Sequence, residues 1–274
     1  GQGLSAIVRT RDHVLVFDAG PRHASGSDAG RLVVIPYLKS LGVQRVDALV
    51  VSHADQDHAG GVAALRAELN VDRVWMGDSD QRRFPAVLPC RAGEVWAWDA
   101  VQFKFLHPQP DKTVSAGNEG SCVLSVKAPG GHVLLTGDIG FESERLLLQA
   151  PEALDADVLV VPHHGSAGSS SPAFVAAVSP NWALVSAGYG NRYGFPKAEV
   201  VDRYQRLGAS VDVTGHSGAI RLVLPSNGEP KLENWRESGR RYWHEPDGCH
   251  ADLAQGSARL QWCGSNAKSS MMPH

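Results

Sequence analysis

The chain has 274 residues, which suits one large domain or one domain with an extension. Hydrophobic residues make up 43% and charged residues 20%, as in ordinary globular proteins. The sequence has no apolar run near the ~18 residues of a membrane-spanning helix. The formal net charge of −3 excludes a protein that attracts nucleic acid by an overall positive field, so a polyanion would need a local patch or a metal. The chain begins Gly-Gln-Gly-Leu without an initiator methionine, so we expect it to be a piece of a longer protein.

The first half of the chain predicts a hairpin followed by strand and helix units. Short β-rich runs at 6–10 and 14–17 predict the hairpin. Helical spacing predicts a helix over 31–41, in which Pro36 is a weak point. A strand at 46–52, a helix at 59–69, a strand at 71–76 and a loop at 78–94 follow.

The second half repeats this order of elements. We expect a strand at 101–106, a loop at 110–120, a hairpin of 122–128 with 132–135, a helix at 142–149 and a strand at 157–161. Ser171 and Pro172 predict the start of a helix that ends at Val178. A strand at 182–186, a helix at 196–207 and strands at 211–213 and 219–224 complete the series. Because hairpins precede strand and helix units twice, the pattern predicts an α+β fold, an αββα sandwich of two mixed sheets with helices outside.

The composition changes after residue 225. We therefore place the domain over residues 1–225 and expect a partly disordered C-terminal extension over 226–274, rich in polar and small residues. A short basic and aromatic run, 240–243, lies within this extension.

The chain has four cysteines, and none of them forms a Cys-x-x-Cys pair, which argues against a structural zinc site. Cys249 and Cys263 flank a short C-terminal stretch. They either form a disulfide, which would suit an oxidising compartment, or remain two free thiols.

The segment 50–61 carries the densest set of metal-binding side chains. His53, Asp55, Asp57 and His58 lie within six residues, between a predicted strand and a predicted helix. Imidazole and carboxylate groups bind divalent cations, and loops at strand ends often present them. A polar helix N-terminus would account for one or two aspartates through the helix dipole, but not for a histidine on each side. The segment therefore predicts a metal site.

Polar residues follow other predicted strands in the same way. These are Asp18, Asn118 with Ser121, Asp138, His163 with His164, and His216. Because each group comes just after an apolar run, we expect one edge of the fold where strand ends converge on a site. For Asp18, a simple role as a turn residue is the alternative.

Three motifs together resemble the metallo-β-lactamase superfamily, whose signature is His-x-His-x-Asp-His. They are His53-Ala-Asp55-Gln-Asp57-His58, Thr136-Gly-Asp138 and His163-His-Gly-Ser166, and the resemblance runs from about residue 1 to 224. The sequence departs from the family at Asp55, where a second histidine is usual, and at Asn118 and Ser121, where a later histidine is usual. With 18–21 and 214–220, these departures resemble the C-terminal domain of the ComEC family of DNA-internalisation proteins.

The resemblance implies a metallo-β-lactamase-like fold that holds two divalent cations. His53 and Asp55 would hold one cation, Asp57, His58 and His163 the other, and Asp138 would bridge them. The choice between His163 and its neighbour His164 stays open. Since Asp55 replaces an imidazole by a carboxylate, manganese is the expected metal, with magnesium and zinc as alternatives.

The resemblance also implies phosphodiester hydrolysis, for which two cations stabilise the attacking and leaving oxygens. Asp57 or Asp55 would orient the nucleophile, and His164 or His216 would contact phosphate or protonate the leaving oxygen. The substrate-binding residues implied are Asp18, Asn118, Ser121 and Ser166.

In that family the domain is expected to be a nuclease that degrades the non-transported strand of incoming DNA during natural transformation. The implied partners are DNA and the membrane-channel portion of the same polypeptide, with the isolated domain monomeric. The implied location is the inner membrane of a Gram-negative bacterium, with this domain in the periplasm. Two alternatives stay open: another metal-dependent phosphodiesterase or esterase, such as one acting on choline phosphate of the cell wall, and a non-catalytic module that guides DNA.

Overall fold

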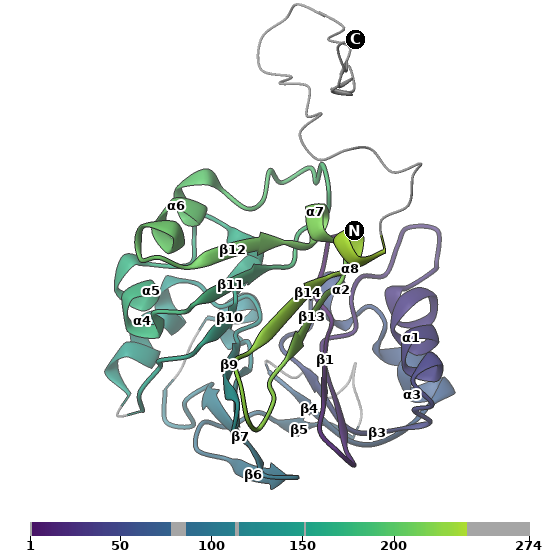
Figure 1. The fold of residues 1–274 in the computed structure, drawn as a ribbon. Coiled ribbons are helices and arrows are strands. Elements are labelled where there is room, and N and C mark those ends of the chain that lie inside the picture. The colour runs from purple at the N-terminus through teal and green to yellow at the C-terminus, as the bar shows by residue number, and fades with distance from the viewer. Residues whose placement is uncertain (1, 78–85, 113–114, 151, 240–274) are drawn as a thin grey trace, which may run out of the picture.

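Two β-sheets pack face to face between two layers of helices (Figure 1). The structure, a computed structural model, describes residues 2–77, 86–112, 115–150 and 152–239. The first sheet has the strand order β1 (Ala6–Arg9), β2 (Val14–Phe17), β3 (Arg45–Val51), β4 (Asn70–Met76) and β5 (Leu88–Pro89). Strands β1 and β2 form the expected antiparallel hairpin, and β2 to β5 are parallel.

The second sheet is larger and also mixed. Its order is β12 (Ser210–Val213), β11 (Trp182–Val185), β10 (Val158–Val160), β9 (Gly131–Leu135), β8 (Val123–Ala128), β7 (Val101–His107) and β6 (Val95–Trp98). Strands β9 to β12 are parallel, and β6 to β9 pair antiparallel. A separate hairpin of β13 (Ile220–Val223) and β14 (Lys231–Asn234) joins residues on both sides of the boundary expected at 225.

Helices cover the outer face of each sheet (Figure 1). A π-helical turn (Gly30–Val34), α1 (Ile35–Ser40) and α3 (Val62–Glu68) lie on the first sheet. The second is covered by α4 (Phe141–Gln149), α5 (Pro172–Val178) and α6 (Ala198–Arg206). Three short helices, α2 (Gln56–Ala59), α7 (Thr214–Ser217) and α8 (Trp235–Ser238), lie in connections. The predicted αββα sandwich of two mixed sheets is confirmed.

The alternation of side chains along the strands builds separate core layers. In β2, Val14 and Val16 pack toward the helices, while Leu15 and Phe17 pack between the sheets. This is the period of two that a strand buried on both faces requires. Phe103 of β7 reaches the same inter-sheet layer from the other side. A third core layer lies beneath α4 to α6. The sheets are therefore fixed against each other, and the loops at their ends are presented on a rigid base.

The structure differs from the prediction where backbone packing or short length decides. The helix expected over 59–69 is broken at Gly60 and Gly61. A Cβ at Gly60 would lie 2.2 Å from the backbone nitrogen of Arg22, and one at Gly61 would lie 2.4 Å from the backbone oxygen of Ala19. The segment expected to be a loop at 78–94 contains β5, a two-residue strand too short to produce a periodic pattern.

A disulfide between Cys90 and Cys122 joins the end of β5 in the first sheet to the start of β8 in the second. Sequence analysis did not anticipate this pair. Cys249, Cys263 and the run 240–243 lie outside the described residues. Within the described part of the chain, none of the helices has the length and apolar character needed to cross a bilayer.

Candidate metal centre

The candidate site lies where the carboxyl ends of strands from both sheets meet. Asp18 follows β2, and the segment that carries His53 and His58 follows β3. Asp138 follows β9 and His164 follows β10. The carboxyl ends of parallel strands are the usual location of sites in open sheets. The structure therefore brings together side chains that are more than 100 positions apart in the sequence, as the strand-end pattern predicted.

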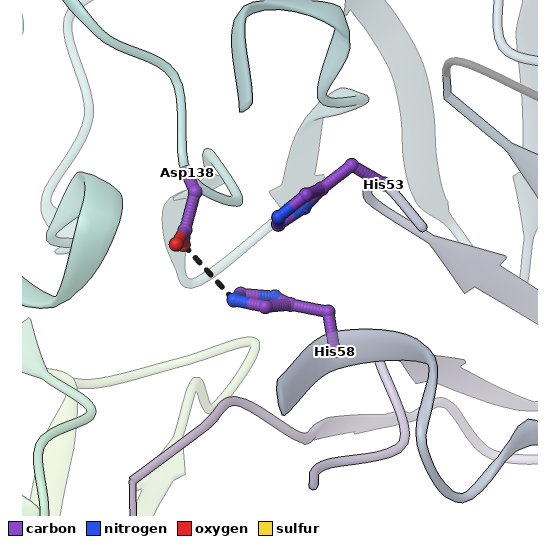
Figure 2. A group of neighbouring side chains, drawn as sticks. All are labelled: His53, His58 and Asp138. Atoms are coloured by element: carbon purple, nitrogen blue, oxygen red, sulfur yellow. Dashed lines mark ion pairs between the residues drawn. The ribbon is translucent and has the colours of Figure 1, made fainter. Parts of the chain in front are cut away.

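Five side chains form a compact cluster of donor atoms: His53, Asp57, His58, Asp138 and His164. His58 Nε2 lies 3.1 Å from Asp138 Oδ1 and 3.2 Å from His164 Nε2. His164 Nε2 lies 3.3 Å from Asp57 Oδ2 and 3.4 Å from Asp138 Oδ2. Donor atoms of His53, His58 and Asp138, the three side chains of Figure 2, lie within 4.8 Å of one another. Those of Asp57, His58 and His164 also lie within 4.8 Å of one another. The two groups share His58, and the two oxygens of Asp138 face different histidines.

Hydrogen bonds behind the cluster fix which nitrogen of each imidazole carries the hydrogen. His58 Nδ1 lies 2.7 Å from Asp18 Oδ2, and His164 Nδ1 lies 2.7 Å from the Ser186 carbonyl oxygen. Since a carboxylate and a carbonyl only accept, both Nδ1 atoms must donate. Whenever each imidazole is neutral, as cation binding requires, its Nε2 lone pair then points into the cluster.

The third imidazole is fixed through a hydroxyl. Ser52 Oγ donates its one hydrogen to Asp18 Oδ2 at 2.8 Å. His53 Nδ1 lies 3.0 Å from the same Oγ, so it must be the donor in that contact. Three Nε2 lone pairs therefore meet two carboxylates at one point. Such an arrangement requires protons or a cation between the donors.

Two buried donor atoms lack partners that a cation would supply. Among the described residues, buried His53 Nε2 makes no hydrogen bond, and buried Asp138 Oδ1 faces His58 Nε2 at 3.1 Å, a contact that needs a proton or a cation between the two atoms. Buried polar atoms are normally paired, so each such atom needs an explanation. Two nitrogens bound to one tetrahedral zinc at ~2.0–2.1 Å are roughly 3.3–3.4 Å apart. The donor separations of 3.1 to 3.4 Å in the cluster are close to this value, and the residues fit a divalent cation.

The charges of the site favour an added positive charge. Burial alone would lower the pKa of His58, but the carboxylates of Asp138 and Asp18 raise that pKa well above its ordinary value. Burial alone would raise the pKa of Asp138, but the charges of His58 and His164 hold it well below its ordinary range. The buried carboxylate of Asp138 thus stays ionised and attracts cations.

Around the cluster lies a more exposed rim. The side chain of Asp55 is 61% exposed, and its Oδ2 lies 3.6 Å from His53 Nε2. Asp57 is 35% exposed on its side chain and so faces both the cluster and solvent. His163 is half-buried and points away from the cluster, where its Nε2 accepts a hydrogen bond from the Asn118 amide at 3.3 Å. Asp55, Asp57, Asn118 and His163 are thus the polar groups that a substrate would meet first.

The turn that carries the histidine pair decides which of the two enters the cluster. His163, His164 and Gly165 have φ values of 50°, 54° and 80°, a left-handed conformation that is unfavourable for side chains with a Cβ. It places His164 among the donors and His163 at the rim. The ligand set expected from the sequence names His163 and leaves the choice between it and His164 open; in the structure His164 lies in a group of donors. The role of His164 as a metal ligand stays a prediction.

Several other expected site residues lie outside the two groups of donors. Asp18 and Ser121 are fully buried, and Ser121 Oγ accepts a hydrogen bond from the Asp138 backbone nitrogen at 3.2 Å. Their assignment to substrate binding is therefore corrected to a supporting position behind the donors. Ser166 Oγ accepts from the Gly168 nitrogen at 3.4 Å. His216 is exposed on α7 and contacts the Tyr189 ring, and it belongs to neither group of donors found among the described residues.

Other residues that shape the site were missed. Ser52 and Ser186 orient imidazoles through the contacts above. Glu119 accepts from Gly140 and Ser143 and so holds the loop after Asp138. Buried Glu144 accepts from the backbone nitrogens of residues 170 and 171, in the loop after His164. Hydrogen-bond partners of this kind leave no spacing signal in a sequence. Ser52 is the exception, because it directly precedes His53 in the metal-binding segment.

Comparison with known proteins identifies the family. The sequence profile of the Metallo-beta-lactamase superfamily matches residues 1–189. The chain belongs to this superfamily. Membership implies a metal-dependent hydrolase that binds divalent cations, in agreement with the donor clusters of the structure.

Two of the relatives similar to this chain carry names from competence and recombination. The chain is 38% identical over 229 residues to "Competence protein ComA" of Neisseria gonorrhoeae, a match that covers 83% of this chain and 32% of the relative. It is 34% identical over 227 residues to "Recombination protein 2" of Haemophilus influenzae, covering 81% and 28%. It is 32% identical over 246 residues to "ComE operon protein 3" of Bacillus subtilis, covering 81% and 32%. The chain spans about a third of the length of these relatives.

Solved structures confirm the fold. The metallo-beta-lactamase fold protein YhfI from Bacillus subtilis has a TM-score of 0.51 at 14% identity and covers 77% of this chain and 88% of its own. A CmlA β-hydroxylase mutant has a TM-score of 0.54 at 15% identity, covering 85% and 52%. Since a hydroxylase shares the fold, the reaction must be argued from the site.

Proposed function

We propose that this chain is a metal-dependent phosphodiesterase that cleaves DNA. The observation that carries the proposal is the cluster of three Nε2 donors and two carboxylates, in which His53 Nε2 is buried without a hydrogen-bond partner and buried Asp138 Oδ1 faces His58 Nε2 at 3.1 Å. The names of the similar proteins from competence and recombination support DNA as the substrate.

The donor set supports two divalent cations. His53, Asp55 and Asp138 would hold one, and Asp57, His58 and His164 would hold the other, because the one free nitrogen of His58 binds a single cation. Exposed Asp55 adds an oxygen donor beside His53, which favours manganese over zinc at that position. When bound, a pair of cations neutralises phosphate charge and lowers the pKa of a coordinated water.

The residues of the rim would bind and orient the substrate. Asp57 faces both the donors and solvent, so its carboxylate can accept a hydrogen bond from an attacking water and hold it in line with phosphorus. Asn118 and His163 form a half-buried polar pair beside the donors. We assign the Asn118 amide of this pair to a phosphate oxygen, and the protonated, imidazolium form of His163 to transfer of its proton to the leaving oxygen.

The biological role that we propose is degradation of the non-transported strand of incoming DNA during natural transformation. The partners are DNA and a membrane-channel portion of the same polypeptide. The disulfide between Cys90 and Cys122 supports an oxidising compartment, so we place the domain on the periplasmic side of the inner membrane of a Gram-negative bacterium.

A cleavage assay with purified protein tests the activity. A labelled single strand of DNA is incubated with manganese, magnesium or zinc, with a chelator as control. We expect cleavage with manganese that the chelator abolishes, and no cleavage by Asp138→Ala or His53→Ala. Full activity of either variant would overturn the site assignment.

Two matched variants and one further substrate sharpen this test. His13 and Asp99 contact each other at the amino end of β2, at the opposite end of that strand from Asp18. His13→Ala and Asp99→Asn should therefore keep full nuclease activity. Hydrolysis of p-nitrophenyl phosphorylcholine without cleavage of DNA would favour the choline-phosphate esterase instead. DNA binding that survives chelation, without cleavage in any metal, would favour a guiding module.

A further inference from the structure

The connection from β11 to α6 presents exposed aromatic rings next to the metal centre. Tyr189 is 69% exposed and Tyr193 is 45% exposed, and half-buried Phe195 lies between Tyr193 and His163. A large exposed ring contributes little to folding, and clustered ones indicate a contact surface. None of the three rings has a role in the hydrolysis proposed above.

Two of these rings, Phe195 and Tyr193, form a row with His163 at the rim of the site. The centroids of His163 and Phe195 are 6.0 Å apart. Those of Phe195 and Tyr193 are 5.5 Å apart, with planes inclined by only 16°. His163 precedes His164, so the row begins directly beside the donor cluster.

Two cations accompany the row. The guanidinium carbon of Arg192 lies 4.8 Å from the centroid of the Tyr193 ring, and Lys197 Nζ lies 5.4 Å from that of Phe195. Neither cation forms an ion pair with a carboxylate within the part of the chain that the structure describes. Both positive charges are therefore available to an anionic ligand.

The loop is braced, so its rings are held in place before a ligand arrives. The side-chain amide nitrogen of Asn191 donates to the carbonyl oxygens of Gly188 and Phe195 at 2.9 and 2.7 Å. The backbone nitrogen of Phe195 donates back to Asn191 Oδ1 at 3.0 Å. The nitrogen of Lys197 donates to the Gly165 carbonyl at 2.9 Å, which docks the loop on the turn that carries the histidines. A rigid binding surface loses little conformational entropy on binding.

We propose that Tyr193 and Phe195, with Arg192 and Lys197, form a base-stacking platform for single-stranded DNA. The proposal rests on the nuclease activity proposed above and names the form of DNA that the site receives. Proteins that hold single strands combine aromatic rings, on which bases stack, with cations that follow the phosphates. The bases of a duplex are covered on both faces by their neighbours, so this platform selects a single strand.

Arg192 holds the place that a base would take. Its guanidinium carbon lies 4.8 Å from the centroid of the Tyr193 ring, and its Nη2 donates an exposed hydrogen bond to the Tyr193 hydroxyl at 2.7 Å. A cation–π contact at an exposed site is weaker than stacking of a base on an aromatic ring. An incoming base therefore displaces the guanidinium, which turns to a phosphate of the same strand.

Binding of two labelled strands tests the platform. The probes are fluorescein-labelled oligo-dT of about 15 nucleotides, within the range of ~4–16 nucleotides that single-strand binding modules cover, and an abasic strand of equal length. Fluorescence anisotropy is measured with a chelator, so that no cleavage occurs. We expect the wild-type protein to prefer oligo-dT and Tyr193→Ala to lose about 5- to 100-fold in affinity for it. Binding of the abasic strand should not change.

Three further variants separate stacking from other effects. Tyr193→Phe keeps the ring and should bind as the wild type does. Arg192→Ala should weaken binding of both strands, because it removes a phosphate contact. Tyr37→Ala removes a ring that is 47% exposed on α1, on the outer face of the first sheet, and should change nothing.

The outcomes distinguish the platform from the nuclease activity. Equal affinity of Tyr193→Ala and the wild type for oligo-dT would overturn the platform, and so would equal affinity of the wild type for both strands. Hydrolysis of methyl p-nitrophenyl phosphate with manganese reports on the metal centre alone, and we expect Tyr193→Ala to retain it. If the wild-type protein fails to hydrolyse this diester, the proposed function fails, while the binding measurements still decide the platform.

Discussion

Replacing Asp18 by asparagine should weaken metal binding although Asp18 is not expected to touch the metal. Asp18 is fully buried and accepts three hydrogen bonds: from Ser52 N at 2.6 Å, from Ser52 Oγ at 2.8 Å and from His58 Nδ1 at 2.7 Å. An asparagine offers one accepting oxygen and one donating NH₂ group. Its nitrogen must therefore face at least one donor. If it faces His58, the imidazole hydrogen moves to Nε2 and the lone pair is lost from the cluster.

The size of the effect follows from the hydrogen bonds that asparagine is unable to accept. Removal of a residue that orients a metal-binding histidine lowers metal affinity by about 10- to 100-fold. At ~1.4 kcal/mol for each factor of ten, this corresponds to about 1.4–2.8 kcal/mol. Leaving a buried donor without an acceptor should also destabilise the fold by about 1–3 kcal/mol. For a chain of this size that equals a fall in melting temperature of roughly 2–10 °C.

Competition with a chromophoric chelator measures the affinity for manganese and zinc in the folded protein, so loss of stability and loss of affinity are recorded separately. Asp47→Asn is the matched control. Asp47 also joins β2 and β3 through one carboxylate, since its Oδ2 accepts from Val14 N at 2.8 Å, but at the other end of the strands. It should keep the wild-type affinity. Equal affinity of Asp18→Asn and the wild type would refute the role of Asp18 in orienting His58.

Three further predictions concern other parts of the molecule. In the same competition assay, His164→Ala should lose more than the ~100-fold expected for an orienting residue, and His163→Ala should lose nothing; the opposite ranking would reverse the assignment of the pair. Cys122→Ser should lower the free energy of unfolding in urea by about 3–4 kcal/mol, because the disulfide closes a loop with a sequence separation of 32, and an unchanged midpoint would contradict this. A hydrogen bond from Thr10 and further bonds from the same hairpin hold the pKa of Asp99 well below its ordinary value. This stabilisation is fully present when the pH is above ~3.9, the pKa of an unfolded aspartate. It is lost progressively as the pH falls from there toward the lower pKa of the folded state. The difference in melting temperature between the wild type and Asp99→Asn should therefore shrink between pH 6 and pH 3, and a constant difference would count against it.

The architecture could be read from the sequence because periodic apolar runs and turn residues mark most strands and helices. The hairpin at the start, the β8–β9 hairpin and the capped helix α5 all lie where they were expected. What escaped was decided by contacts between distant segments. The break at Gly60 comes from the backbone of Arg22 passing close by, and the Cys90–Cys122 pair forms only once the two sheets have packed together.

The donor residues of the site could be predicted for a similar reason. A histidine or aspartate just after a buried strand lies at the carboxyl edge of a sheet, whatever the rest of the chain does. The choice between His163 and His164 could not be made in this way. Both follow the same strand, and only the left-handed turn through Gly165, fitted against Pro196, sends the second imidazole inward.

The sequence motif does not show which nitrogen of each imidazole carries the hydrogen. An imidazole binds a cation only through a nitrogen without hydrogen, and here Asp18, Ser52 and Ser186 decide which nitrogen that is. A protein with all the histidines of the signature but an apolar residue in place of Asp18 would match the same pattern. Its His58 would no longer be held with the Nε2 lone pair toward the cluster. Two orienting residues, Ser52 and Asp18, therefore belong to the metal site as much as the donors do. Ser52 precedes His53 in the chain, and Asp18 follows β2. The wider motif, from Asp18 to Ser186, is the better sequence criterion for a site that can bind metal.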